Sequence, residues 1–526
     1  MTRQTWSLAS ELATNRRQFI LSGASLAVLP WLGGMTLGQS RENPTFKSDP
    51  FTLGVASGDP SPDGMVLWTR LAPEPLAEDG GLPAETYPVR WEIAADEAMQ
   101  DIVKKGTALA TPQLAHSVHV EVSGLEPDRW YWYRFSCGDA QTVVGRTRTT
   151  PRRSAKPDQL RFAFASCQHY ESGLYTAYEH MAKEDLDLIL HLGDYIYEGA
   201  ARENNVRQHN SREIETLAEY RARLALYHTD EHLQAAHALC PWLVVWDDHE
   251  VDNNYATDIS EQKGVEPRDL LLRRANAYQA YYENMPLRAR SMPKGPDMKI
   301  FRRIPYGRLA QFDMLDTRQY RSDQPNNDKA GPLAGDVFNP DATLLGDAQE
   351  KWLMAGMLRS TSNWNILGQQ IMMGRANRGA EDQDRFSMDQ WSGYDVPRSR
   401  LLKFIAERRI PNPVVLTGDI HKNWVNDLQV DFDNESDPVV ATEFVGTSIS
   451  SSGNGIEKPR EHESVMSRNP FVKFFNGERG YVSCTVTPKE WKSDYQVVEY
   501  IDKPGAPLVT RASFVVESNK PGAQQA

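Results

Sequence analysis

The chain has 526 residues, of which 40% are hydrophobic and 25% are charged, a composition that excludes a disordered or collagen-like protein. Its 58 Lys and Arg residues against 71 Asp and Glu residues give a formal net charge of −13, which argues against a broad basic surface for nucleic acid. Four cysteines are too few to build a disulfide scaffold in a chain of this length.

The amino-terminal segment is typical of an export signal. Arg16 and Arg17 precede a weakly apolar run that extends from Ile20 to about Leu32. This run is too short and too rich in Gly, Ala and Ser to cross a membrane, and the alternative is a helix packed on the body of the protein. We predict a twin-arginine signal over residues 1–38, recognition by the twin-arginine export machinery, and a periplasmic or secreted mature chain with no stable membrane anchor.

Residues 45–150 are predicted to form a small β-sandwich. Their short segments alternate between apolar and polar residues, and Gly and Pro separate them. A Gly-Leu-Glu-Pro-Asp turn precedes Tyr131 and resembles the corner of immunoglobulin-like and fibronectin-like sandwiches. The aromatic run at its end is therefore interpreted as core and corner rather than as a sugar-binding platform. The predicted strands include 89–93, 118–122 and 130–135.

An α/β domain is predicted over residues 158–520, after a polar linker at 151–157 that begins and ends with proline. Apolar strand-like runs alternate there with segments whose apolar residues recur every three or four positions. The helical candidates are 214–238, 267–284, 347–360 and 398–408.

Several predicted strands of this domain end in residues with chemically reactive side chains. In open α/β sheets, ligands bind outside the carboxyl ends of the strands, so these side chains are expected to meet at one edge. The strand ends are Ser166-Cys167, Gly193-Asp194, the Asp-Asp-His-Glu stretch at 247–250, Asp316-Thr317-Arg318 and Gly418-Asp-Ile-His421.

This convergence predicts a metal site, because clustered carboxylates repel one another unless cations neutralise them. A thiolate and a phenolate together favour a highly charged ion such as Fe³⁺. A neighbouring position with oxygen ligands suits Ca²⁺, in one or two copies, although Mg²⁺ or Mn²⁺ also fits. The predicted metal ligands are Cys167, Asp194, Tyr197, Asp248, Asp419 and His421.

Four further residues are predicted to act on a substrate. Two metal ions about 3.5–4 Å apart generate hydroxide and neutralise a phosphate group. His249 is then placed to polarise the substrate or to protonate the leaving oxygen, and Arg318 to bind a phosphoryl oxygen through its planar guanidinium. Asn253 and Asn254 are candidate donors to the same group or ligands of the second ion.

Each of these assignments has a simpler structural alternative. The alternative for His249 is a buried, hydrogen-bonded histidine. Arg318 could equally tie loops together through Asp316. Cys167 on its own would be a small buried residue or half of a disulfide. The pairing of the other three cysteines, Cys137, Cys240 and Cys484, stays open.

Seven short motifs occur along the chain: FTLGVASGDP at 51–60, VLWTRL at 66–71, SCQ at 166–168, GDYIYE at 193–198, DDHE at 247–250, LDTR at 315–318 and GDIH at 418–421. These motifs resemble PhoD-type alkaline phosphatases and, more widely, metallophosphoesterases related to purple acid phosphatases. The resemblance implies a four-layer αββα sandwich in which helices flank two facing sheets, preceded by the small β-sandwich. It also implies an Fe³⁺ site with Ca²⁺ nearby.

By position in these motifs, the resemblance implies that Asp194 bridges the metals and that Asp419 serves the second ion. Tyr197, Cys167 and His421 would bind the iron. The sequence departs from the wider family in two places. Asp248 stands where that family has an asparagine ligand, and Gln369 and Gln370 are the nearest substitutes for a further histidine ligand.

The function predicted from the sequence is an exported, metal-dependent alkaline phosphatase acting on small phosphate esters. Metal-activated hydroxide would attack phosphorus in phosphomonoesters and in phosphodiesters. One alternative is a phosphodiesterase or phospholipase-D-like hydrolase on the same fold. An alternative of another class is a non-catalytic surface binding protein that metals merely stabilise, although such a protein would have no need of His249 and Arg318.

Overall fold

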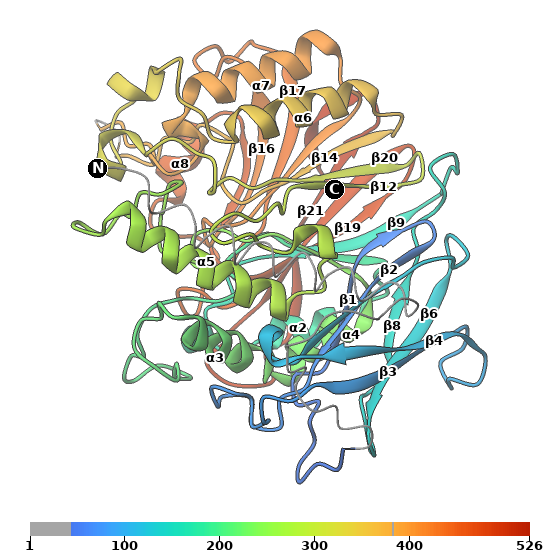
Figure 1. Cartoon of the computed structure of the whole chain (residues 1–526). Helices are drawn as coiled ribbons and strands as arrows, with labels where there is room; N and C mark the ends of the chain where they lie inside the picture. The colour runs from blue at the N-terminus through green and yellow to red at the C-terminus, as the bar shows by residue number, and fades with distance from the viewer. Residues whose placement is uncertain (1–43, 381–382) are drawn as a thin grey trace, which may run out of the picture.

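The computed structural model describes residues 44–380 and 383–526. The predicted export signal lies outside these residues. Two large sheets face one another, with helices on their outer sides and the amino-terminal strands at one end, drawn in blue in Figure 1. Within the described part of the chain, no helix is long and apolar enough to cross a membrane.

The first sheet has ten strands and contains three of the predicted strand ends. Four central strands, β9, β10, β11 and β1, are parallel to one another, and the strands on either side of this group are antiparallel. In order across the sheet the strands are β22 (Lys520–Gln525), β21 (Leu508–Glu517), β20 (Glu490–Val498), β19 (Arg479–Val486), β9 (Leu160–Ala165), β10 (Leu188–His191), β11 (Trp242–Val244), β1 (Val55–Ser61), β2 (Gly64–Arg70) and β5 (Ser117–Val122).

The second sheet has seven strands and contains the other predicted strand ends. Its strands β13, β14, β15 and β17 are parallel, so their carboxyl ends lie at the same edge. In order they are β12 (Arg302–Tyr306), β13 (Ala310–Met314), β14 (Trp364–Gly368), β15 (Pro413–Thr417), β17 (Val439–Val445), β16 (Asn423–Gln429) and β18 (Val472–Asn476).

The two sheets pack face to face through one large apolar core. The ring of Phe162 in β9 meets that of Phe312 in β13 edge-on, with centroids 5.4 Å apart. Leu190 of the first sheet and Val414 of the second belong to the same buried cluster. Strands buried on both faces read as nearly continuous apolar runs, which explains why these central strands were recognisable in the sequence.

Helices cover the outer faces of both sheets (Figure 1). Buried leucines of α6 and α7 pack on the seven-stranded sheet, while α2, α3 and α4 contribute to the core beside the ten-stranded sheet. The range 214–238, predicted as one helical segment, contains two helices with a break at Thr229 and Asp230. The helices are α2 (Thr176–Met181), α3 (Leu217–His228), α4 (Glu231–Leu239), α5 (Pro267–Asn284), α6 (Gly346–Arg359), α7 (Asp395–Arg408) and α8 (His462–Arg468).

The amino-terminal strands form two packed layers, but only one layer is a separate sheet. That sheet packs through Val89 and Phe135 on a core to which β1, β2 and β5 also contribute. Since β1 pairs with β11, the second layer continues into the ten-stranded sheet. Tyr131 accepts a hydrogen bond from the Glu126 N–H at 2.9 Å, which makes the predicted corner. The separate sheet contains β4 (Ile102–Ala110), β3 (Tyr87–Ala94), β6 (Trp130–Cys137), β7 (Ala140–Gln141) and β8 (Gly145–Arg148).

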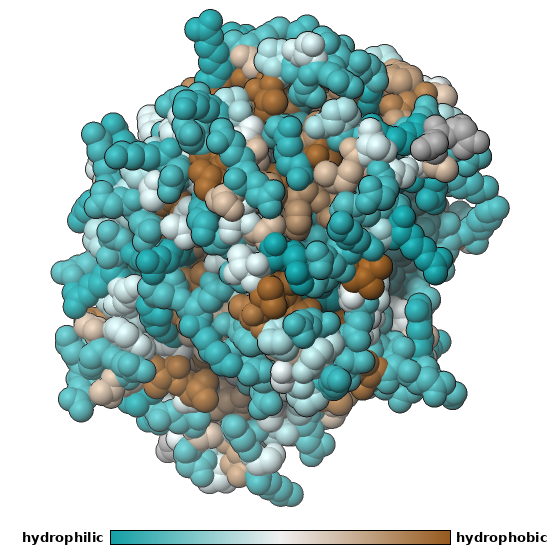
Figure 2. All heavy atoms as spheres, turned by 180° about the vertical axis from the view of Figure 1, so that it is seen from behind, coloured by the Kyte–Doolittle hydropathy of each residue, from teal (hydrophilic) through white to brown (hydrophobic). Residues whose placement is uncertain are grey.

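The surface is mainly hydrophilic. Seen from behind, hydrophobic residues appear in small scattered groups rather than as one broad patch (Figure 2). The large apolar residues that are most exposed lie on separate elements, such as Leu109 in β4 and Leu272 in α5. Scattered apolar residues of this kind are normal for a folded domain and need no partner.

Candidate metal centre and active site

The predicted site residues follow strands of both sheets. β9, β10 and β11 lead to Cys167, Asp194 and Asp248, while β15 leads to Asp419 and His421. Because the parallel strands of each sheet end at one edge and the sheets face one another, donors from both sheets meet between those edges. The structure thus brings together all six predicted metal ligands.

Four of these ligands have left-handed backbone conformations. The φ angle is +60° at Cys167, +57° at Asp194, +61° at Asp419 and +54° at His421. Residues with a side chain adopt this region at a cost in energy, and such conformations concentrate at functional sites where the surrounding structure imposes them. The backbone is therefore bent at the points where the donors must turn toward one another.

One donor cluster combines sulfur, nitrogen and oxygen. Donor atoms of Cys167, Asp194 and His421 lie within 4.8 Å of one another. Tyr197 joins them, because its hydroxyl lies 2.9 Å from Asp194 Oδ2 and 3.1 Å from His421 Nε2. Burial lowers the pKa of His421 to about 3, which leaves the imidazole neutral and able to bind a metal.

A second cluster consists of carboxylates alone. Oxygens of Asp194, Asp247, Asp248 and Asp419 lie within 4.8 Å of one another, so Asp194 belongs to both clusters. Burial raises the pKa values of Asp194 and Asp247 well above the usual range and that of Asp419 to about 6. Arg318 offsets part of this effect at Asp247 and Asp419. With His249, it also keeps the pKa of Asp248 below its usual value despite burial.

Three carboxylate oxygens in these clusters lack a hydrogen-bond partner. Asp194 Oδ1, Asp247 Oδ2 and Asp248 Oδ1 are buried, and no donor within the described ranges reaches them. Buried anionic oxygens need a compensating positive charge. The donor types fit the expected ions, since oxygen ligands suit Ca²⁺ or Mg²⁺ while thiolate, phenolate and imidazole suit iron.

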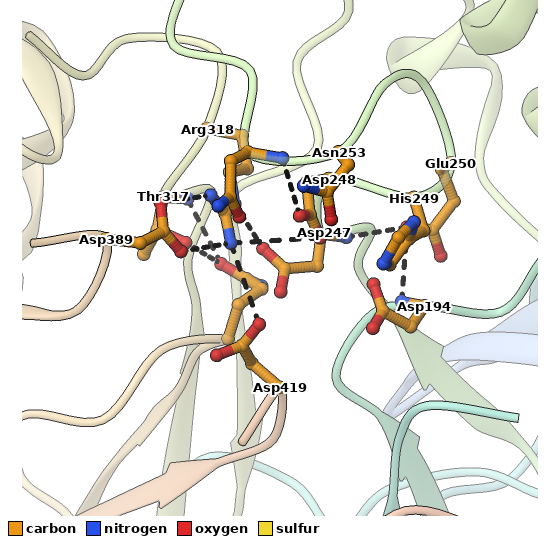
Figure 3. Close-up of polar contacts among 12 residues, drawn as sticks. Asp194, Asp247, Asp248, His249, Glu250, Asn253, Thr317, Arg318, Asp389 and Asp419 are labelled. Atoms are coloured by element: carbon orange, nitrogen blue, oxygen red, sulfur yellow. Dashed lines mark hydrogen bonds and ion pairs between the residues drawn. The ribbon is translucent and has the colours of Figure 1, made fainter. Parts of the chain in front are cut away.

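Arg318 lies at the centre of a buried network of carboxylates. Its side chain is fully buried, and it donates to Asp247 at 2.5 Å and to Asp389 at 2.7 and 2.9 Å. The guanidinium also lies 3.8 Å from Asp248 and from Asp419. Figure 3 shows Arg318 between Asp389 and Asp247, with Asp419 below. In this arrangement the positive charge of Arg318 offsets part of the negative charge of the acidic cluster.

His249 lies beside the clusters and is the more exposed of the predicted catalytic residues. Its Nδ1 is 2.7 Å from Glu198 Oε2, and its ring packs on that of Tyr197 at 4.1 Å. Its side chain is 21% exposed. Burial lowers the pKa of His249, but Glu198, Asp248 and Asp194 outweigh this effect and raise it well above its usual value.

The two asparagines after this histidine bind carboxylates through both backbone and side chain. The Asn253 N–H donates to Glu198 at 2.9 Å, and its side chain donates to Glu261 at 2.6 Å. The Asn254 N–H donates to Asp248 at 2.8 Å, and its side chain to Asp328 at 2.6 Å. Their backbone groups therefore orient Glu198 and a predicted metal ligand.

Other residues at the strand ends hold the loops in place. Gln370 binds Thr317 at 2.6 Å and Leu315 O at 3.0 Å, and Gln369 binds Thr417 and Trp391, each at 2.8 Å. Both glutamines are thus engaged in tying strands together. All four cysteines are free of disulfides and buried.

Several acidic and amide residues that support the site are not predicted from the sequence. Glu250 accepts the N–H groups of Asp194, Tyr195 and Asp247 at 3.1, 2.6 and 2.8 Å, and so fastens two ligand-bearing loops together. Glu250 and Glu198 belong to the motifs DDHE and GDYIYE. Their position next to predicted metal ligands could have indicated a supporting role. Asp389 and Gln390, which binds Asp419, come from an aperiodic stretch that carried no such signal.

Comparison with known proteins identifies the family. The sequence model described as "PhoD-like phosphatase" matches residues 162–495, and that of the "PhoD-like phosphatase, N-terminal domain" matches residues 38–151. The chain belongs to the PhoD-like phosphatases. It is therefore a phosphoric ester hydrolase, and the alternative of a non-catalytic binding protein is not supported.

Two relatives extend this result over nearly the whole chain. The sequence is 52% identical over 519 residues to alkaline phosphatase D of Bacillus subtilis (strain 168), an alignment that covers 97% of this chain and 88% of the relative. A solved structure of PhoD is 53% identical, covers 92% of this chain and 93% of its own, and has a TM-score of 0.90. This PhoD-like phosphatase thus shares the mixed α/β architecture of that structure.

Proposed function

We propose that the protein is an exported, metal-dependent alkaline phosphatase that hydrolyses phosphomonoesters and, as a second substrate class, phosphodiesters. The observation that carries the proposal is a set of buried carboxylate oxygens on Asp194, Asp247 and Asp248 that accept no hydrogen bond from the described residues. These oxygens lie in two donor clusters that share Asp194, an arrangement suited to a pair of cations.

The proposed ions differ because the donor sets differ. Cys167, Asp194, Tyr197 and His421 would hold Fe³⁺. Asp248 and Asp419, together with the shared Asp194, would hold Ca²⁺, in one or two copies, with Mg²⁺ or Mn²⁺ as the substitute at that position. When bound, the ions supply positive charge that lowers the pKa of water and neutralises the phosphate group.

His249 is proposed to handle the proton of the leaving group. Glu198 holds Nδ1 at 2.7 Å, which leaves Nε2 as the nitrogen that donates to the departing oxygen. Arg318 is proposed to support the metal site by holding Asp247, Asp248 and Asp419 in place, because its own donors are occupied by carboxylates. A direct contact of Arg318 with phosphate would require its guanidinium to leave Asp389.

Asn253 and Asn254 are proposed substrate-binding residues at the rim of the site. Both side chains are only partly buried, and both donate to carboxylates on neighbouring loops. A substrate oxygen that replaced Glu261 or Asp328 as the acceptor would place the amide donors on the phosphate or on its leaving group.

We propose the wider organisation that the sequence predicts. We propose a twin-arginine signal over residues 1–38, an amino-terminal domain over 45–150, and a four-layer αββα catalytic domain over 158–520. The catalytic domain is proposed on the helices that cover the outer faces of two facing sheets. The signal is proposed on the paired arginines and the short apolar run alone.

The decisive experiment measures metal content and phosphatase activity together. A chromogenic phosphomonoester and its diester are assayed before and after exhaustive dialysis against chelator, and elemental analysis follows bound iron and calcium. We expect both activities to disappear with the metals and to return when they are restored. Activity that survives complete metal removal would refute the proposal, and a diester rate far above the monoester rate would favour the phosphodiesterase alternative.

A further inference from the structure

Two consecutive serines contact three of the proposed iron ligands. Ser451 Oγ lies 2.7 Å from the Tyr197 hydroxyl and 2.7 Å from the Cys167 carbonyl oxygen. Ser452 Oγ lies 3.0 Å from His421 Nδ1. The serines belong to the loop that follows β17 of the seven-stranded sheet, whereas Cys167 and Tyr197 come from the ten-stranded sheet.

This loop is fastened to the Cys167 loop of the opposite sheet. The Ile449 N–H donates to Ser166 O at 3.0 Å, and the Ser451 N–H donates to Cys167 O at 3.2 Å. Ser448 Oγ closes the turn by donating to Ser451 O at 2.9 Å. The two serine hydroxyls are therefore held at fixed positions between the sheets, and Ser451 is itself buried.

The Ser451 hydroxyl has one proton to donate and two acceptor oxygens at the same distance of 2.7 Å. Ser451 Oγ accepts the His169 N–H at 3.1 Å, and its proton is then shared between Cys167 O and the Tyr197 oxygen. A tyrosine bound to a metal as phenolate can only accept hydrogen bonds, and bonds to an anion are the stronger ones. The Ser451 hydroxyl therefore donates its hydrogen bond to the Tyr197 oxygen when that residue is a ligand.

Ser452 and Tyr197 contact different nitrogens of the His421 ring. His421 Nε2 is the nitrogen that lies 3.1 Å from the Tyr197 hydroxyl, whereas Nδ1 is bound by Ser452. A metal-binding histidine usually has its second nitrogen held by a hydrogen bond, which fixes the ring orientation and the tautomer. With Nδ1 protonated and donating to Ser452, the lone pair of Nε2 is free for the ion.

We propose that Ser451 and Ser452 are positioning residues of the metal centre. Ser451 donates to the phenolate of Tyr197, and Ser452 holds His421 with Nε2 directed at the same ion. This inference rests on the proposed function, which makes Tyr197 and His421 ligands. One loop would then orient two ligands that come from different sheets.

The proposal predicts two separable effects. A hydrogen bond to a phenolate lowers the energy of the phenolate electrons and so raises the energy of the phenolate-to-iron charge-transfer transition. Removal of the hydrogen bond therefore moves this absorption band to longer wavelength. Loss of either serine hydroxyl also loosens a ligand, and removal of such an outer partner typically weakens metal binding by about 10–100-fold. A merely structural role for the loop would move neither the band nor the rate of metal release selectively.

The test compares Ser451→Ala and Ser452→Ala with Ser450→Ala as the matched control. Ser450 is buried like Ser451 and lies in the same loop, but its hydroxyl donates to His169 O at 2.9 Å. We expect Ser451→Ala to shift the visible band to longer wavelength and to release metal into chelator about ten-fold faster. Ser452→Ala is expected to speed release with little change in the band, Ser450→Ala to keep both properties, and Ser451→Thr to restore the wild-type band.

The outcomes separate this inference from the proposed function. A coloured, active wild-type protein whose Ser451→Ala and Ser452→Ala variants keep its band and its release rate would overturn the inference alone. A wild-type protein that is colourless and iron-free would remove the proposed iron site, and with it the bond from Ser451 to a phenolate. In that case the release rate of whichever ion is bound still decides the role of Ser452, which is exposed, so its substitution leaves the fold intact.

Discussion

Replacement of Arg318 by leucine tests whether its guanidinium serves the acidic cluster or a substrate phosphate. The buried side chain donates to Asp247 at 2.5 Å and to Asp389 at 2.7 and 2.9 Å, and it lies 3.8 Å from Asp248 and Asp419. Removal of one partner from a buried ion pair typically destabilises a protein by about 3–5 kcal/mol. We therefore expect Arg318→Leu to lose roughly that free energy of unfolding in metal-free protein at pH 8.

The loss is expected to depend on pH. Burial raises the pKa of Asp247 well above its usual range and that of Asp419 to about 6, and loss of Arg318 raises both further. When the pKa of a carboxyl group is higher in the folded than in the unfolded state, the group destabilises the fold as the pH rises above the unfolded pKa. The loss of unfolding free energy then grows until the pH exceeds the folded pKa. The variant should therefore differ least from the wild type near pH 5 and most at pH 8.

The assay is urea unfolding of chelator-treated protein at pH 5 and pH 8, with Arg321→Leu as the control. Arg321 is also buried and binds Asp389 at 2.9 Å, but its remaining donors go to Tyr394 and to a backbone carbonyl. Its loss should destabilise the fold without the additional pH dependence. A role of Arg318 in the acidic cluster is refuted if Arg318→Leu is as stable as the wild type at pH 8 while its KM for a phosphate ester rises ten-fold or more at unchanged kcat.

Three further changes test other parts of the site and core. Glu198→Gln should lower kcat about 100-fold at unchanged metal content, because it removes the carboxylate that holds His249, and an equal loss of bound metal would contradict this role. Gly193→Ala should reduce metal content and activity together, since φ is +111° and a Cβ would lie 2.5 Å from that of Asp247; full metal occupancy in this variant would count against it. Burial lowers the pKa of His191 to about 3, so this residue stays neutral when folded and stability falls as the pH drops below about 6.5. His191→Phe should flatten that fall by about 1.4 kcal/mol per pH unit in urea unfolding, and an unchanged slope would refute the assignment.

Local patterns were sufficient for most of the elements that position the site. Helix α5 occupies the predicted range 267–284, with proline at its start. The range 214–238 was less accurate, because apolar spacing alone does not reveal a break between two helices. Asp230 makes that break by accepting the N–H groups of His232 and Leu233 at the start of α4, a capping interaction that a single side chain determines.

The convergence of the ligands was predictable because it depends on a general property of parallel strands. The residues that complete the site depend instead on tertiary contacts. Asp389 reaches Arg318 from a stretch 71 positions away in sequence, and Ser451 reaches Tyr197 across 254 positions. Neither stretch has a period or a motif that relates it to its partner. The continuation of the amino-terminal strands into the ten-stranded sheet is of the same kind, since it rests on one bridge between Gly58 and Trp242.

The distribution of the donors between the two sheets links metal binding to the packing of the whole domain. Asp194 follows a strand of the first sheet and Asp419 a strand of the second, yet their oxygens lie within 4.8 Å in one cluster. Repulsion between these carboxylates opposes the close approach of the two strand ends, and Arg318 supplies only one positive charge against it. The ions proposed here would therefore close the sheets at this edge as well as supply the chemistry, because the same charges that lower the pKa of water also offset the repulsion between the strand ends.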